Sequence, residues 1–198
     1  KNAILAAEDE RFYQHTGVDY IGVARAAYSN LASGGSKRQG ASTITMQVAR
    51  NFFLSSERTW TRKIYEALLS FKIEATLSKD QILELYINQI YLGQRAYGFA
   101  AASQIYFGKS LDKVNAAEAA MLAGLPKAPA TYDPLKYPDK ALERQKQVLE
   151  LMVRHGYLDQ ASADKAAAAP LALKEGRGPG ETTNTETLAP HFAAYVYE

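Results

Sequence analysis

The chain has 198 residues and a formal net charge of +2, with 47% hydrophobic and 22% charged residues. This length suffices for one domain with a buried core, or one domain with a tail, and the composition is typical of globular proteins. The near-neutral charge gives no reason to expect a nucleic-acid partner, and the absence of cysteine excludes disulfides and thiolate metal sites.

Almost every segment of the chain has the apolar periodicity of a helix. The expected helices cover residues 20–31, 42–53, 60–77, 79–92, 116–124 and 140–155, with a short alanine-rich helix before Pro170. Two of them begin with capping boxes, at Ser78 and at Asn115. Because no alternation of strands and helices is visible, the sequence predicts an all-α fold.

The helix expected over residues 60–77 has two distinct faces. Its apolar stripe consists of Trp60, Ile64, Leu68, Phe71 and Ala75, and its polar stripe of Arg62, Glu66, Ser70 and Glu74. A helix with a wide apolar surface and a single polar stripe is expected to be mostly buried.

The ends of the chain indicate a fragment. No apolar run approaches the ~18 residues of a membrane-spanning helix, and no signal peptide is visible. The chain begins on Lys1 without an initiator Met and ends directly after an apolar, aromatic stretch. We therefore expect that an upstream membrane anchor has been removed.

The segment from Glu8 to Asp19 is the richest in residues that can carry chemistry. Glu8 follows the apolar run Ile4–Ala7, and apolar surroundings raise the pKa of a carboxyl toward the range useful for proton transfer. Acidic helix ends are also common for electrostatic reasons alone. A catalytic role for Glu8 therefore depends on the rest of the chain, and Glu10 is expected to be an ordinary solvated acid.

A possible anion site begins at residue 40. Small and hydroxyl residues over 40–47 open a helix, whose free N–H groups either bind an anion or are simply capped. A basic series follows, interleaved with aromatic residues: Arg50, Arg58, Arg62 and Lys63 beside Phe52, Phe53 and Trp60. This series suits an anionic ligand with an apolar part, or else forms a solvated basic face.

Glu66 lies one turn after Arg62 and Lys63 on the same helix face. One interpretation is a surface ion pair worth a few tenths of a kcal/mol. The other is a second functional carboxylate, because pairs of carboxylates from distant segments serve glycosidic chemistry.

Five motifs in order carry a resemblance to a known family. They are Glu8-Asp9-x-x-Phe12-x-x-His15-x-Gly17-x-Asp19, Gly40-x-Ser42-Thr43-Ile44-Thr45-x-Gln47, Arg62-Lys63-x-x-Glu66, Lys79-x-x-Ile82-Leu83-Glu84-x-Tyr86-x-Asn88-x-x-Tyr91-x-Gly93 and Arg144-x-x-x-Val148-Leu149. The pattern resembles glycosyltransferase family 51, the peptidoglycan glycosyltransferases, from residue 3 to about residue 160.

The resemblance implies a lysozyme-like all-α fold, with a larger globular lobe and a smaller jaw lobe that faces the membrane. It implies lipid II and the growing glycan strand as substrates. Glu8 matches the family's general base and Glu66 its second acidic residue. The matched substrate-binding residues are Asp9, Phe12, His15, Ser42, Thr43, Gln47, Arg50, Asn51, Arg58 and Lys63, to which the basic series adds Arg62.

The resemblance also implies partners and a location. Residues 1–173 are expected to form the glycosyltransferase domain, and residues 174–198 a linker toward the transpeptidase domain of a class A penicillin-binding protein. The enzyme would act at the outer, periplasmic face of the bacterial cytoplasmic membrane. The residues point to no protein-held metal site, although a divalent cation, Mg²⁺ or Mn²⁺, would suit the donor pyrophosphate.

Two other functions compete with glycan polymerisation. A lytic muramidase would share the fold, but it would not need a row of cations for a pyrophosphate. A helical membrane-binding module would use Phe52, Phe53 and the cations for lipid docking, and Glu8 would be incidental.

Overall fold

The computed structural model describes residues 1–32, 42–53 and 60–174. Within these residues the secondary structure is helical: α1 (Asn2–Glu8), α2 (Tyr20–Ala32), α3 (Ile44–Phe53), α4 (Trp60–Thr76), α5 (Lys79–Gln89), α6 (Phe99–Phe107), α7 (Ala116–Gly124), α8 (Pro138–Arg154) and α9 (Gln160–Ala168), with short 3₁₀ turns η1 (Phe12–Gln14), η2 (Leu111–Lys113) and η3 (Leu125–Lys127). The predicted all-α class is confirmed.

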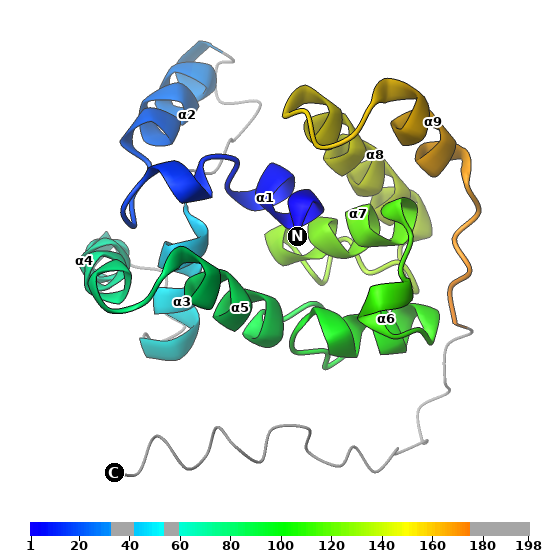
Figure 1. Ribbon diagram of the computed structural model, residues 1–198, viewed down its shortest axis with the longest axis horizontal. Coiled ribbons are helices and arrows are strands. Elements are labelled where there is room, and N and C mark those ends of the chain that lie inside the picture. Colours follow the sequence, from blue (N-terminus) through cyan, green and yellow to red (C-terminus); the bar gives the residue numbers. More distant parts are fainter. Residues whose placement is uncertain (33–41, 54–59, 175–198) are drawn as a thin grey trace.

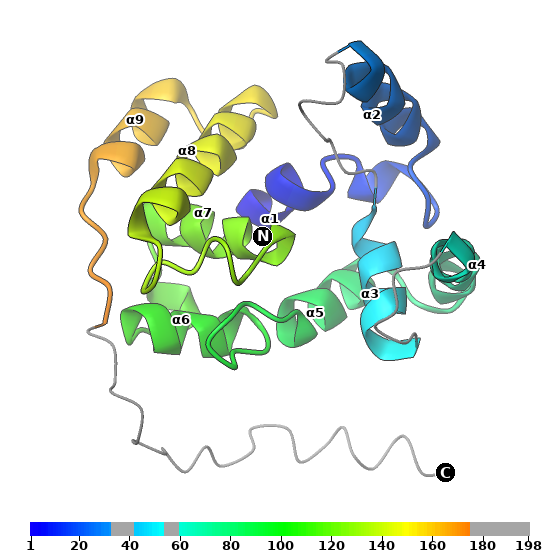
Figure 2. The same ribbon diagram turned by 180° about the vertical axis from the view of Figure 1, so that it is seen from behind.

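The helices pack in two groups (Figures 1 and 2). In the larger group, α7 lies against α8, α1 packs on both, and α9 covers α8 and α7. In the smaller group, α3 lies against α4 and α5. Since α5 also contacts α6, which contacts α7, α5 and α6 connect the two groups. The structure thus has the larger and smaller lobes that were expected.

Both predicted capping boxes form. Ser78 Oγ accepts a hydrogen bond from Gln81 N at 3.3 Å, and Gln81 Oε1 accepts from Ser78 N at 2.8 Å. At the start of α7, Asn115 and Glu118 exchange the corresponding bonds at 2.9 and 3.0 Å. These reciprocal bonds satisfy N–H groups that the helix itself leaves unpaired.

The helix expected to reach Gly93 ends earlier, at Gln89. Beyond it the chain folds back on itself: Gly98 N donates to Ile90 O at 2.8 Å, and Leu92 N donates to Ala96 O at 2.9 Å. The return is tight at Gly98, where a Cβ would lie 2.4 Å from Asn88 O and the φ angle is +81°. Backbone groups of Ile90 and Leu92, which would have extended α5, therefore form hydrogen bonds within this turn.

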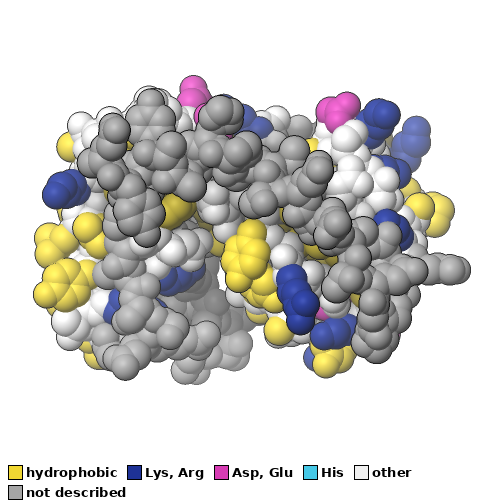
Figure 3. Space-filling view, turned by 90° about the horizontal axis from the view of Figure 1, so that it is seen from below, with side chains coloured by type: hydrophobic (Ala, Val, Ile, Leu, Met, Phe, Trp, Pro, Cys, Tyr) yellow, Lys and Arg dark blue, Asp and Glu magenta, His cyan; other side chains and the backbone are white. Residues whose placement is uncertain are grey.

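The prediction that α4 is mostly buried is wrong. Its apolar stripe faces outward: Trp60 is 86% exposed and Ile64 61%, whereas Glu66 on the polar stripe is fully buried. The buried polar groups have partners on neighbouring helices, such as Thr45 Oγ1, which donates to Glu74 Oε1 at 2.6 Å. Polar groups are found buried in proteins where they are hydrogen-bonded or paired with an opposite charge. Figure 3 shows hydrophobic side chains at the edge of the molecule where α4 lies.

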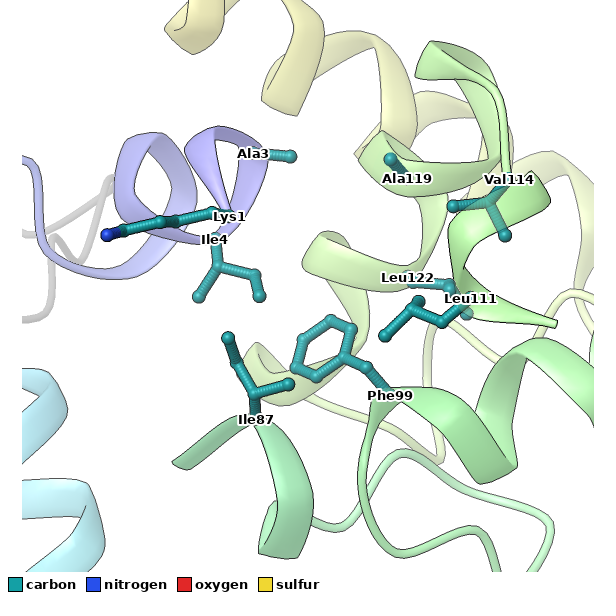
Figure 4. A pocket seen from close by; sticks show the side chains of 9 residues that line it. All are labelled: Lys1, Ala3, Ile4, Ile87, Phe99, Leu111, Val114, Ala119 and Leu122. Atoms are coloured by element: carbon teal, nitrogen blue, oxygen red, sulfur yellow. The ribbon is translucent and has the colours of Figure 1, made fainter. Parts of the chain in front are cut away.

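A small apolar pocket lies beside the start of α1 (Figure 4). Its volume is about 130 Å³, and Lys1 is the one charged residue in its lining. The other lining residues are Ala3 and Ile4 of α1, Ile87 of α5, Phe99 of α6, and Leu111, Val114, Ala119 and Leu122. Because no carboxylate lines it, this pocket is not the site of the proton transfer expected of Glu8.

Candidate active site

Glu8 is the last residue of α1, whose preceding turn is buried in the core through Ala3, Ile4, Leu5 and Ala6. Gln47 Nε2 of α3 donates a hydrogen bond to Glu8 Oε2 at 2.8 Å. Burial raises the pKa of the Glu8 carboxyl above its ordinary value of 4.5, while the Gln47 bond and nearby cations act in the opposite direction. The packing of α1 thus produces a carboxylate with enhanced basicity.

Tyr86 fixes the orientation of Gln47. The buried Tyr86 hydroxyl donates to Gln47 Oε1 at 3.4 Å, so the amide nitrogen of Gln47 faces Glu8. Burial, and secondarily the charge of Glu8, raises the pKa of Tyr86 well above its ordinary value of 10. Tyr86 therefore keeps its proton and remains a donor.

Asp9 connects the end of α1 to the start of α3. Its two carboxylate oxygens lie 3.0 and 3.1 Å from His15 Nε2, and Oδ2 accepts from Ile44 N at 3.0 Å. Both side chains are buried. Asp9 therefore holds the turn that follows Glu8 against the helix that carries Gln47.

The start of α3 is capped. Thr43 Oγ1 accepts a hydrogen bond from Met46 N at 3.1 Å, and Asp9 already uses the N–H of Ile44. Thr43 itself is buried and donates to Gly17 O. The N-cap interpretation of this segment is therefore the one that fits, since Ile44 N and Met46 N have protein partners in place of an anion.

Glu66 is the centre of a second network. Lys63 Nζ donates to Glu66 Oε2 at 2.6 Å, and Arg62 Nε lies 3.2 Å from Glu66 Oε1. Lys63 Nζ also donates to Ser42 Oγ at 2.7 Å, which joins α4 to the segment before α3. Glu66 is fully buried, whereas the Lys63 side chain is 39% exposed. Glu66 therefore orients a cation that a ligand can still reach.

Three further residues near Glu8 were not among the predicted site residues: Tyr86, Lys127 and Arg144. The charges of Arg144, Arg50 and Lys127 all act on Glu8. Arg144 of α8 is buried, and its Nε donates to Gly124 O at 3.4 Å. Tyr86 and Arg144 belong to the five sequence motifs, so the sequence indicated that they could be site residues. No motif includes Lys127, which lies in η3.

The structure sorts the predicted site residues into groups. Gln47 and Arg50 lie with Glu8, whereas Ser42, Arg62 and Lys63 lie with Glu66. Asp9, His15 and Thr43 support the turn and the helix start. Phe12 has no exposed surface, and Lys79 Nζ lies 4.4 Å from its ring centroid, so its role here is packing and not cleft lining. Asn51 is exposed on α3, and Arg58 lies outside the described residues.

Among the residues that the structure describes, no three His, Asp or Glu side chains are grouped closely enough to hold a metal ion. Both oxygens of Glu66 are engaged by cations.

A sequence profile of the family described as Transglycosylase matches residues 1–153. The chain belongs to the transglycosylase family. Among its relatives, penicillin-binding protein 1A of Neisseria lactamica is 61% identical over 166 residues, which are 84% of this chain and 21% of that protein. A candidate transglycosylase of Cupriavidus necator is 57% identical over 172 residues, which are 87% of this chain and 74% of that protein.

A solved structure with a related sequence is penicillin-binding protein 1A from Haemophilus influenzae, which is 34% identical. The match covers 67% of this chain and 17% of that one, with a TM-score of 0.48. This chain spans about a fifth of the length of the penicillin-binding proteins it matches. Membership of the family makes the chain a peptidoglycan glycosyltransferase, the enzyme class that the five motifs implied.

Proposed function

We propose that this transglycosylase polymerises lipid II into β-1,4-linked glycan strands, with Glu8 as the general base. The observation that carries the proposal is the setting of Glu8 at the end of α1. Glu8 is partly buried, burial raises its pKa, Gln47 donates a hydrogen bond to one of its oxygens, and the charges of Arg144, Arg50 and Lys127 act on it. Within the described residues, Glu8 Oε1 accepts no hydrogen bond, so this oxygen is available to a substrate hydroxyl.

The proposed reaction is a single inverting displacement. The 4-hydroxyl oxygen of the acceptor sugar attacks the anomeric carbon of the donor as Glu8 takes the hydroxyl proton. The bond from the anomeric carbon to the lipid pyrophosphate breaks, and the pyrophosphate leaves with the electron pair. An α-linked donor thereby gives a β-linked glycan without a covalent enzyme intermediate.

Cations on α3 and α4 would neutralise the leaving group. Lys63 is held by Glu66 and Ser42 while part of its side chain stays accessible. Arg50 lies on the same helix as Gln47. Preorganised cations stabilise negative charge that develops in a transition state. Arg58 is assigned to the same role from the family resemblance.

The exposed apolar surface of α4 would bind the membrane that holds the lipid substrate. Trp60, Ile64, Leu68 and Phe71 follow one face of the helix, and α2 exposes Tyr20, Ile21, Tyr28 and Leu31. Exposed apolar surface of this extent marks an interaction site. None of the described helices is both long and apolar enough to cross a membrane.

The relatives extend this proposal to the whole protein. Because the matched penicillin-binding proteins are several times longer than this chain, we propose that it works with a covalently linked transpeptidase domain. It would act at the periplasmic face of the cytoplasmic membrane, anchored by a helix outside this sequence.

The test is incubation with lipid II, followed by separation of glycan products. The wild-type protein should form polymer, and Glu8→Gln should form none, because the amide cannot accept the hydroxyl proton. Glu143→Gln, which alters an exposed carboxylate on α8, is the matched control and should retain activity. Shortening of preformed glycan would instead indicate a muramidase, and lipid binding without either product would indicate a membrane-binding module.

A further inference from the structure

Glu10 lies two residues after Glu8 and is not the solvated acid that its sequence position suggested. Glu10 Oε2 lies 2.8 Å from His155 Nε2, and Glu10 Oε1 pairs with Arg25 Nη1. The Glu10 side chain is 22% exposed. Both carboxylate oxygens are therefore engaged by residues far away in the sequence.

These three residues, called here the Glu10 bridge, connect separate parts of the fold. Arg25 lies in α2, and His155 directly follows α8. In Figure 2, α2 and α8 lie on either side of α1, whose last residue is Glu8. Ala26 is the one buried residue of α2, so packing alone fixes the place of this helix weakly.

The segment that carries Glu8 needs such support. The chain leaves the helix at Asp9, with φ −161° and ψ 81°. The next backbone hydrogen bond along the chain runs from Phe12 N to Asp9 O at 3.2 Å. Asp9 ties this turn to His15 and to the start of α3. Glu10 ties the same turn to α2 and α8. Two successive carboxylates thus hold it from different sides.

We propose that Glu10 is a positioning residue, which acts through Arg25 and His155 to fix the turn beside Glu8 and the spacing of α2 and α8 around it. This inference rests on the proposed role of Glu8 as general base. Ion pairs that are partly exposed contribute little to stability, but misplacement of a reacting group by about 1 Å can slow a reaction ~100-fold. Loss of the Glu10 carboxylate should therefore lower the rate of the reaction more than it lowers the stability of the fold.

The kinetic test compares Glu10→Gln with the wild-type protein on lipid II. We expect kcat to fall about 10-fold, KM to stay within about twofold, and Tm to fall by less than about 4 °C. Glu118→Gln is the matched control, because Glu118 also engages two partners, Lys109 and Asn115, but at the start of α7. The control should lower Tm at least as much while kcat stays within about twofold.

Double substitution separates a bridge from independent contacts. If Arg25 acts through Glu10, Glu10→Gln combined with Arg25→Gln should lower kcat no further than Glu10→Gln alone. Arg25→Lys keeps the positive charge, so this variant should retain most of the wild-type kcat. Additive losses, or a wild-type kcat in Glu10→Gln when Glu8→Gln is inactive, would overturn the inference and leave the proposed function intact.

A distance measurement tests the bridge without any substrate. Since the chain has no cysteine, Ala27→Cys on α2 and Glu150→Cys on α8 introduce two unique positions for spin labels. Both positions are exposed. The distribution of label distances should be narrow with Glu10 and broader with Glu10→Gln. An unchanged distribution would contradict the inference whether or not the protein polymerises lipid II.

Discussion

At the scale of single residues, Glu8 experiences two opposing effects. Burial at the end of α1 disfavours its charged form, whereas Gln47 and the surrounding cations favour it, and burial is the larger effect. The end of a helix carries partial negative charge, which also disfavours a carboxylate. The charge needed for proton abstraction is therefore held at a cost to folding.

That cost predicts a pH-dependent effect of Glu8→Gln on stability. The pKa of Glu8 is higher in the folded than in the unfolded protein, so stability is lost as the pH rises through the folded-state pKa. The neutral glutamine avoids this loss. Denaturant titration should show a higher free energy of unfolding for Glu8→Gln than for wild type at pH 8, with the difference shrinking toward pH 4.

If the free energies of unfolding of Glu8→Gln and wild type differed by the same amount at pH 8 and at pH 4, burial would not disfavour the charge of Glu8. Glu143→Gln, at an exposed position, should show no such pH-dependent gain.

Tyr86→Phe tests the orientation of Gln47. Loss of the hydroxyl leaves Gln47 Oε1 buried without its donor, which costs about 1–3 kcal/mol, and frees the amide to rotate away from Glu8. We expect kcat to fall several-fold and the unfolding free energy to fall by about 1 kcal/mol. Tyr137→Phe, on an exposed tyrosine, is the control, and equal behaviour of the two variants would remove Tyr86 from the site.

At the scale of elements, the joint between α3 and α4 places the cations. Lys63 reaches Ser42 across this joint and Glu66 within α4. Its removal leaves the buried Glu66 with Arg62 as its ion-pair partner. The joint therefore couples the position of a donor-site cation to the packing of two helices.

Lys63→Ala should lower kcat/KM for lipid II about 10- to 100-fold, because a preorganised cation is lost from the leaving-group site. Lys63→Arg keeps the charge and should lose less. Lys72→Ala, on the same helix but exposed, is the control. A wild-type kcat/KM in Lys63→Ala would exclude the pyrophosphate assignment.

The exposed face of α4 leads to a separate prediction for membranes. Replacement of Trp60, Ile64 and Leu68 by serine removes apolar surface that does not belong to the core. Burial of each large side chain in a membrane interface is worth up to about 1.5–3 kcal/mol. Cosedimentation with phospholipid vesicles should be lost, whereas Tm stays within a few degrees of wild type.

Replacement of Tyr137, exposed elsewhere on the fold, by serine should leave vesicle binding intact. If the triple variant still bound vesicles, the exposed apolar side chains of α2 would be the membrane-binding surface instead.

The orientation of α4 marks a limit of sequence-based prediction. Its periodicity indicated two stripes correctly, and α2, α7 and α9 lie close to where the pattern placed them. Periodicity cannot say which stripe faces the protein, because a paired polar stripe such as Glu66 and Glu74 can be buried. The side of α4 that is buried depends on partners supplied by other helices.

At the scale of the whole molecule, the site joins segments that are distant in the sequence. Glu8 and Gln47 were recognisable from their motifs, and the structure connects them directly. Lys127 reaches the same region only because η3 follows the packing of α7 on α8 and α1. Such convergence is a property of tertiary packing and has no local sequence signal.

The proposed mechanism therefore depends on Glu8 being a base whose pKa is raised by the fold. The most direct measurement combines an NMR titration of the ¹³C-labelled Glu8 side chain with the pH profile of kcat/KM on lipid II. We predict that Glu8 titrates above 4.5 and that the acidic limb of the profile coincides with this titration. A Glu8 titration at or below 4.5, or an acidic limb unrelated to it, would contradict the role of Glu8 as the general base.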